Sequence, residues 1–248
     1  MKVEEFGGEN EKTIVMLHGA NFVHSFGRQY VLANQYHIIV PHIMGFGDEA
    51  DKVFEAEACV RELAEYIESL GKKVTLVGFS LGSQLAFKLV SEYTHLFNSA
   101  ILVSPWLIKE ASLLSYAVEA NLKQLGLFKK RWLCNIIGLM NGLLPSDLRK
   151  EFVEQMQNVK EETIRNAVDN GITIESVPSF ATVSIPVVAI AGAKEQKEVL
   201  DGVIKLSEIN ANCRYEIWNK AGHNIPPVFG KKFNELICSV VSTIKSQD

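Results

Sequence analysis

The stretch KKVTLVGFSLGSQLAF, residues 72–87, places a serine between two glycines where one apolar segment gives way to another. The run at 74–77 has the composition of a buried strand, and the leucines that follow recur every four residues, as in a helix. Ser80 therefore lies where a strand turns directly into a helix. Such a turn strains the serine backbone, and the glycines at 78 and 82 remove side chains that would collide there.

The G-x-S-x-G pattern by itself is weakly specific, because glycine and serine are common residues. Its position directly after a predicted strand and directly before a predicted helix is what a nucleophile elbow requires. The helix N-terminus would also stabilise negative charge developing next to Ser80. The alternative is a simple strand-to-helix turn in which the serine caps the helix.

Strand and helix patterns alternate along most of the chain. Apolar strand-like runs cover residues 13–19, 37–47, 73–79, 99–105 and 186–192, and residues 213–219 alternate like a strand near a sheet edge. Helical periodicity covers residues 54–71, 80–93 and 231–245. Alternation of this kind predicts an α/β fold with a mostly parallel sheet and crossover helices on both faces.

Residues 106–184 interrupt the alternation, because they contain helical patterns and no convincing strand. The segment leaves from the end of a predicted strand, and ligands of open α/β sheets bind at that edge. We therefore expect a core formed by residues 1–105 and 185–248, with 106–184 as a helical cap over a pocket. The alternative is an insertion that only enlarges the fold.

Bulk composition excludes several classes of protein. The 248 residues carry a net charge of −4 with 47% hydrophobic residues, so nothing indicates nucleic-acid binding. Four widely spaced cysteines form no C-x-x-C pair, which argues against structural zinc and against a disulfide framework. The start of the chain lacks the pattern of a signal peptide, and no apolar run is long enough for a membrane span. We expect a cytoplasmic protein, with its oligomeric state left open.

A serine hydroxyl needs a base, and His223 is the best placed of the six histidines. It follows the last predicted strand and so lies at the same sheet edge as Ser80. The base needs a carboxylate from another strand end, and Glu195 occupies the loop after the strand at 186–192. Glu198 and Asp201 are alternatives, but both fall in the next predicted helix.

These motifs together resemble those of α/β-hydrolase fold enzymes, of the capped esterase type related to proline iminopeptidases, C–C bond hydrolases and small carboxylesterases. The matching segments are VMLHGA (15–20), VPHIMGFGDE (40–49), GFSLG (78–82) and GHNIP (222–226). The resemblance covers nearly the whole chain and implies a sheet of seven or eight strands. It implies a Ser80, Glu195, His223 triad in the chain order typical of the fold.

The chain departs from this family pattern in three places. Glu195 stands where Asp is commoner, so its extra methylene requires a retracted loop. His42 stands where many relatives carry Asp. The segment before the first apolar run is short, which favours seven strands over eight.

The resemblance also implies an oxyanion hole formed by backbone N–H groups. Leu81, the residue after the nucleophile, would supply one donor and Ala20 the other, with Asn21 as second choice. The reaction would pass through an acyl-enzyme and needs no metal and no organic cofactor.

Substrate preference depends on the cap, where the sequence is least informative. Aromatic and aliphatic side chains there could line the pocket or form the core of the cap: Trp106, Leu107, Phe128, Trp132, Ile136, Met140 and Leu143. Of these we select Trp106, Trp132 and Met140, together with Asn21, as candidate substrate contacts. The resulting hypothesis is a serine hydrolase that acts on a small, apolar carboxylic ester. Alternatives are a thioesterase or C–C bond hydrolase with the same triad, or a non-catalytic receptor for a small ligand.

Overall fold

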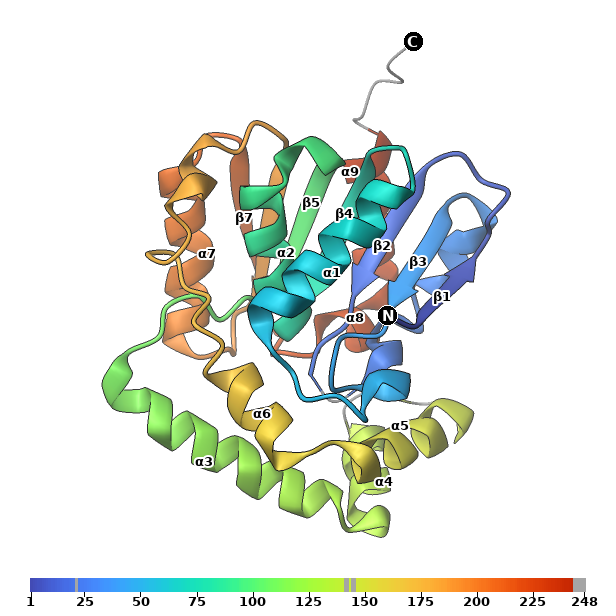
Figure 1. Cartoon of the computed structure of the whole chain (residues 1–248), viewed down its shortest axis with the longest axis vertical. Helices are drawn as coiled ribbons and strands as arrows, with labels where there is room; N and C mark the ends of the chain where they lie inside the picture. Colours follow the sequence, from blue (N-terminus) through green and yellow to red (C-terminus); the bar gives the residue numbers. More distant parts are fainter. Residues whose placement is uncertain (21, 141–142, 144–145, 243–248) are drawn as a thin grey trace.

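The computed structural model describes the whole chain except residues 21, 141–142, 144–145 and 243–248. A central sheet has helices on both faces, and a separate group of helices covers one end of it (Figure 1). This arrangement confirms the predicted α/β class.

The sheet has seven strands in the described part of the chain, in the order β1-β3-β2-β4-β5-β6-β7. Their bounds are β1 Val3–Phe6, β2 Thr13–Leu17, β3 His37–Pro41, β4 Val74–Phe79, β5 Phe97–Val103, β6 Val187–Gly192 and β7 Cys213–Trp218. The short strand β1 pairs antiparallel with β3, and every other pair is parallel. β2 to β4 and β6 are buried along their whole length, which explains their continuous apolar composition. The alternating β7 lies at an edge, as its pattern predicts.

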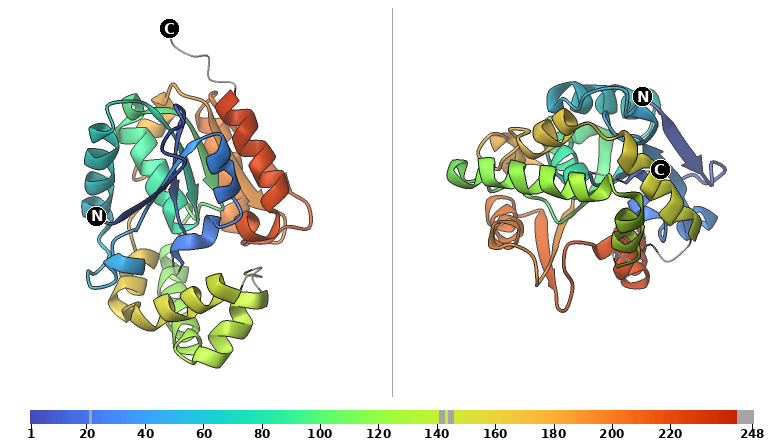
Figure 2. Two further views of the ribbon diagram at one scale, coloured as in Figure 1. Left: turned by 90° about the vertical axis from the view of Figure 1, so that its right-hand side faces the viewer. Right: turned by 90° about the horizontal axis from the view of Figure 1, so that it is seen from below.

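Two sets of helices cover the two faces of the sheet (Figures 1 and 2). On one face lie α1 (Ala56–Ser69), α2 (Leu81–Glu92) and α7 (Lys197–Ile209), whose apolar residues form one cluster with that face. On the other lie α8 (Ile225–Val228), α9 (Gly230–Ser242) and two short 3-10 helices, Val23–Phe26 and Tyr30–Asn34. The carboxyl ends of the parallel strands are therefore left for loops and for the cap.

Capping residues set both ends of α1. The Glu55 side chain caps α1 by accepting hydrogen bonds from the Glu57 and Ala58 N–H groups. Gly71 follows the end of α1 with φ of +64°, a left-handed conformation that glycine adopts without a Cβ penalty.

Four helices form the cap, a name used from here on for α3 (Ala111–Phe128), α4 (Arg131–Met140), α5 (Ser146–Asn158) and α6 (Glu161–Val168). Figures 1 and 2 show them beyond the carboxyl ends of the strands, apart from the helices that flank the sheet. The apolar stripe of residues 146–168 is divided between α5 and α6, because the backbone at Lys160 is extended.

The chain returns to the core before residue 184. The Ile174 N–H donates to the Leu107 carbonyl at 3.1 Å, and the ring of Phe180 packs 5.0 Å from that of Phe87 in α2. We therefore propose that residues 111–168 act as the cap unit and that 172–184 belong with the core, a shorter insertion than 106–184.

Candidate active site

The turn at Ser80 is as strained as the sequence predicts. Ser80 has φ of 54° and ψ of −116°, a region that residues with a Cβ rarely adopt. A Cβ on Gly78 would lie 2.4 Å from the Gly82 carbonyl oxygen, and one on Gly82 would lie 2.1 Å from the Leu17 carbonyl oxygen. Glycine at both positions lets α2 start close against β2 and β4, and the turn leaves Ser80 projecting at the carboxyl edge.

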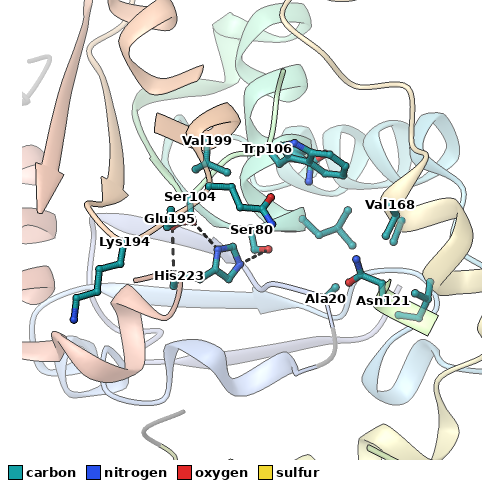
Figure 3. Close-up of a pocket in the computed structure, with 15 residues that line it drawn as sticks. Ala20, Ser80, Ser104, Trp106, Asn121, Val168, Lys194, Glu195, Val199 and His223 are labelled. Carbon is teal, nitrogen blue, oxygen red and sulfur yellow. Dashed lines mark hydrogen bonds and ion pairs between the residues drawn. The ribbon is translucent and has the colours of Figure 1, made fainter. Parts of the chain in front are cut away.

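The structure brings Ser80, His223 and Glu195 into one hydrogen-bonded row (Figure 3). His223 Nε2 lies 2.9 Å from Ser80 Oγ, and His223 Nδ1 lies 2.8 Å from Glu195 Oε2. Ser80 follows β4, Glu195 follows β6 and His223 follows β7, so three parallel strand ends supply the row. A carboxylate only accepts hydrogen bonds, so Nδ1 carries the proton and the Nε2 lone pair faces the hydroxyl.

The second carboxylate oxygen of Glu195 is also hydrogen-bonded. Oε1 accepts hydrogen bonds from the Ser104 hydroxyl at 2.6 Å and from the Gly192 N–H at 3.0 Å. Burial by itself raises the pKa of Glu195. The hydrogen bonds and charge of His223, with those from Ser104 and Gly192, outweigh it and hold the pKa below its ordinary value. The carboxylate is 3% exposed and stays ionised beside a half-exposed imidazole.

The backbone beside Ser80 is arranged to bind an anionic oxygen. Leu81 is the first residue of α2, so its N–H has no carbonyl partner within the helix. Ala20 lines the same cavity as Ser80 and Leu81. We propose these two N–H groups as the oxyanion hole.

His18 has a structural part in this region. Its Nδ1 donates to the Gly19 carbonyl at 2.7 Å, and its Nε2 accepts from the Ile43 N–H at 2.9 Å. Complete burial lowers the pKa of His18 to about 3, so the ring is neutral and fixes the loop that carries Ala20.

In the described part of the chain, two cavities adjoin Ser80 and share five lining residues, Ala20, Ser80, Asn121, Gln196 and His223. One, of about 350 Å³, is bounded by α2, α6 and α7, and its walls are mostly apolar. The other, of about 570 Å³, extends under α3 and α5 towards α8. A substrate bound across Ser80 would place one part in each cavity.

The predicted substrate contacts differ in whether they line one of these cavities. Trp106 lines the smaller cavity (Figure 3), and Phe128 and Leu143 line the larger one. Leu107 is fully buried in the core. Asn21 lies outside the described residues.

The prediction for Trp132 and Met140 is wrong, because these side chains are 68% and 79% exposed and line neither cavity. The apolar spacing of α4 does not show which side faces inward. Gly138 of α4 packs against Phe152 of α5, and this contact turns Trp132, Ile136 and Met140 outward.

Sequence reasoning missed two polar residues of the site. Ser104 directly follows β5 at the same edge as Ser80, and that position was a usable signal. Gln84 is a polar residue one turn beyond Ser80 in a mostly apolar helix, and it lines the smaller cavity.

Among the described residues, no group of three or more His, Cys, Asp or Glu side chains is placed to hold a metal ion. Within the same residues, no helix is both long enough and apolar enough to span a membrane.

The fold and the row of serine, histidine and carboxylate define a protein of the hydrolase class. Residues 12–228 match the family described as alpha/beta hydrolase fold, and the chain belongs to that family.

Solved structures share the fold at low sequence identity. MenH from S. aureus is 18% identical with a TM-score of 0.75, and the match covers 98% of this chain and 97% of that one. The esterase EaEST from Exiguobacterium antarcticum is 19% identical with a TM-score of 0.77, covering 97% and 94%. The enol-lactonase from Burkholderia xenovorans LB400 is 16% identical with a TM-score of 0.77, covering 97% and 96%. No protein of curated function matches this chain in sequence.

Proposed function

We propose that this protein is a serine hydrolase that cleaves a small carboxylic ester through an acyl-enzyme, with Ser80, His223 and Glu195 as its triad. The observation that carries the proposal is the unbroken row from the strained Ser80 through His223 to the buried Glu195. A receptor that only binds a small ligand has no need of all three groups in this geometry.

In the first half-reaction, His223 Nε2 takes the proton of Ser80 Oγ while that oxygen attacks the ester carbonyl. The carbonyl oxygen becomes an anion that accepts hydrogen bonds from the Leu81 and Ala20 N–H groups. Collapse of this intermediate breaks the ester C–O bond, and His223 gives its proton to the departing alkoxide. The products are an alcohol and the Ser80 ester of the acyl group.

Water completes the cycle by the same route. His223 removes a proton from water, the hydroxide attacks the acyl-enzyme, and the proton returns to Ser80 as the acid leaves. Each oxyanion donor contributes about 3–4 kcal/mol to lowering such barriers. Glu195 keeps the Nδ1 proton in place and stabilises the imidazolium in both halves.

The cavities support a small substrate with largely apolar parts. Trp106, Ile164 and Val168 contribute to the walls of the smaller cavity, and Phe22, Phe128 and Phe152 to those of the larger. The four cysteines are free thiols, so we also propose a reducing, cytoplasmic setting.

Labelling with a fluorophosphonate probe tests the triad directly. We expect the wild type to label and Ser80→Ala to lose both labelling and p-nitrophenyl ester hydrolysis by at least about 10⁴-fold. Ser112→Ala, at an exposed position of α3, is the matched control and should behave like the wild type.

A wild type that folds but neither labels nor hydrolyses any ester would contradict the proposal and favour a receptor. A panel of oxygen esters, thioesters and C–C ring-cleavage substrates then identifies the bond cleaved. Faster turnover of thioesters or ring-cleavage products would replace the ester with that substrate class and leave the triad roles unchanged.

A further inference from the structure

A series of hydrogen-bonded side-chain amides leads from the half-buried Lys109 to the smaller cavity beside Ser80. Lys109 Nζ donates to Asn170 Oδ1, and the Ile172 N–H donates to the same oxygen at 3.0 Å. Asn170 Nδ2 in turn lies 2.9 Å from Gln84 Oε1. These residues connect the segment after the cap with α2.

The direction of this series is fixed by Lys109. An ammonium and a backbone N–H can only donate, so the atom of Asn170 that faces them must be the oxygen. The Asn170 amide nitrogen therefore faces Gln84, and it also donates to the Ala167 carbonyl at 2.9 Å. Only an oxygen of Gln84 can accept from it, and this leaves Gln84 Nε2 as the free end.

Gln84 Nε2 is a hydrogen-bond donor with no partner among the described residues. The residue is only 5% exposed, yet it lines the cavity of about 350 Å³, and its nitrogen is not sealed by neighbouring atoms. Water in the cavity can accept from this N–H₂ group, so a ligand that displaces the water must supply an acceptor or leave the donor unsatisfied at a cost in free energy. The rest of the wall around it is largely apolar, with Trp106, Ile164 and Val199.

We place the acyl group in the smaller cavity as part of the inference below. His223 and Ala20 line both cavities, but Asn224 and Pro227, which follow His223 in the chain, line the larger one, so we place the leaving group there. The smaller cavity instead contains Leu81, the proposed oxyanion donor, and Gln84 one helical turn beyond Ser80.

We propose that Gln84 is a specificity residue whose Nε2 binds a neutral carbonyl-type oxygen on the acyl group of the substrate. This rests on the proposed function, and it specifies the substrate as an apolar acyl chain with one hydrogen-bond acceptor. A neutral acceptor fits better than a carboxylate. Lys109 is held by Asn170, and Lys194 points away from Ser80 on the far side of His223 (Figure 3).

Two matched esters test the assignment. p-Nitrophenyl 4-oxopentanoate carries a ketone where p-nitrophenyl 4-methylpentanoate carries a branched carbon of similar shape. Their ratio of kcat/KM, corrected for their hydroxide-catalysed rates, reports recognition of the ketone. We expect the wild type to prefer the oxo ester by about tenfold, the usual value of one hydrogen bond.

Three variants separate the donor from the shape of the cavity. Gln84→Met keeps the volume and removes the donor, so the ratio should fall to about one. Asn170→Asp replaces the donor that fixes Gln84 with an acceptor, so the Gln84 amide should turn and the ratio should also collapse. Gln124→Met makes the same substitution in the larger cavity only and should leave the ratio unchanged.

The outcomes also separate this inference from the hydrolase proposal. If the wild type labels with fluorophosphonate but shows the same ratio as Gln84→Met, the specificity role is wrong and the hydrolase stands. Selectivity for an acceptor in the leaving group, without selectivity in the acyl group, would equally overturn it. If the wild type does not label, calorimetric binding of 4-oxopentanoate and 4-methylpentanoate to Ser80→Ala still tests Gln84, and equal affinities would count against it.

Discussion

His223 and His24 both contact carboxylates through Nδ1, and the difference between their second partners separates a proposed base from a structural link. His223 has Glu195 on Nδ1 and the Ser80 hydroxyl on Nε2. His24 has Glu151 on Nδ1 at 2.8 Å and Glu4 on Nε2 at 2.9 Å. Glu4 comes from β1 and Glu151 from α5, so His24 joins the sheet to the cap.

The partner on the second nitrogen decides what each ring can do. Carboxylates only accept, so His24 must donate from both nitrogens and is an imidazolium in this arrangement. Burial lowers the pKa of His24, but the hydrogen bonds and charges of Glu151 and Glu4 outweigh it and raise the pKa above 6.5. His24 has no free lone pair with which to accept a proton. His223 keeps one, directed at a hydroxyl, and that is the requirement for a base.

The largest expected effect comes from changing the hydrogen bond between Glu195 and His223. In Glu195→Gln the Gly192 N–H still donates to one oxygen, so the new NH₂ faces His223. His223 must then accept at Nδ1 and carry its proton on Nε2, which removes the lone pair facing Ser80. We expect kcat for ester hydrolysis to fall by about 10⁴-fold.

Steady-state kinetics with a p-nitrophenyl ester measure this loss. The control is Glu198→Gln, in α7 just beyond the same loop, and we expect it to stay near wild-type activity. Activity of Glu195→Gln close to that of the wild type would show that Glu195 does not orient the base.

The residues that define this row are partly visible in the sequence because their constraints are local. Gly78 and Gly82 are required by close backbone contacts at the turn, and strand ends place Ser80, Glu195 and His223 at one edge of the sheet. The same local reasoning predicts the order of strands and helices along the chain, including a helical insertion between β5 and β6.

Other features depend on contacts between distant segments and could not be predicted. The orientation of Gln84 is set by Asn170, 86 residues later in the chain. The outward position of Trp132 and Met140 follows from how α4 packs on α5, which a helical apolar pattern leaves undetermined.

A smaller effect is expected at Ser104, which we propose as a positioning residue for Glu195. Its hydroxyl donates to Oε1 at 2.6 Å from a backbone with φ of 53°. In Ser104→Ala the Gly192 N–H remains as the donor to this oxygen. The glutamate side chain, which is one methylene longer than aspartate, is then held less firmly. We expect kcat to fall about tenfold, because one hydrogen bond to the ionised group is lost.

A pH profile of kcat/KM distinguishes positioning from simple destabilisation. Ser104 helps to lower the pKa of Glu195, so its removal lets the carboxylate bind a proton more readily, and the acid limb should move to higher pH. A loss of unfolding free energy with an unchanged profile would reduce Ser104 to a packing role.

The smallest effect is expected at the His24 link, where the charge of Glu151 can be removed without changing its shape. The raised pKa of His24 contributes stability that is complete below pH 6.5 and is lost as pH rises through the folded value. Burial raises the pKa of Glu4, but His24 and His42 outweigh it and lower the pKa below 4.5. The stability that Glu4 contributes is therefore lost as pH falls through its folded pKa. The link should therefore be strongest between pH 4.5 and 6.5.

Urea unfolding of Glu151→Gln at pH 6 and at pH 8.5 tests this window. We expect a loss of about 0.5–1 kcal/mol at pH 6, since the carboxylate is partly exposed and screened by solvent, and a smaller loss at pH 8.5. Glu154→Gln, exposed on the same helix, should show no such difference between the two pH values. An equal loss at both would mean that His24 is neutral there. The distinction drawn between the two histidines would then lie in geometry alone, because both rings would have a lone pair and only His223 would direct it at a hydroxyl.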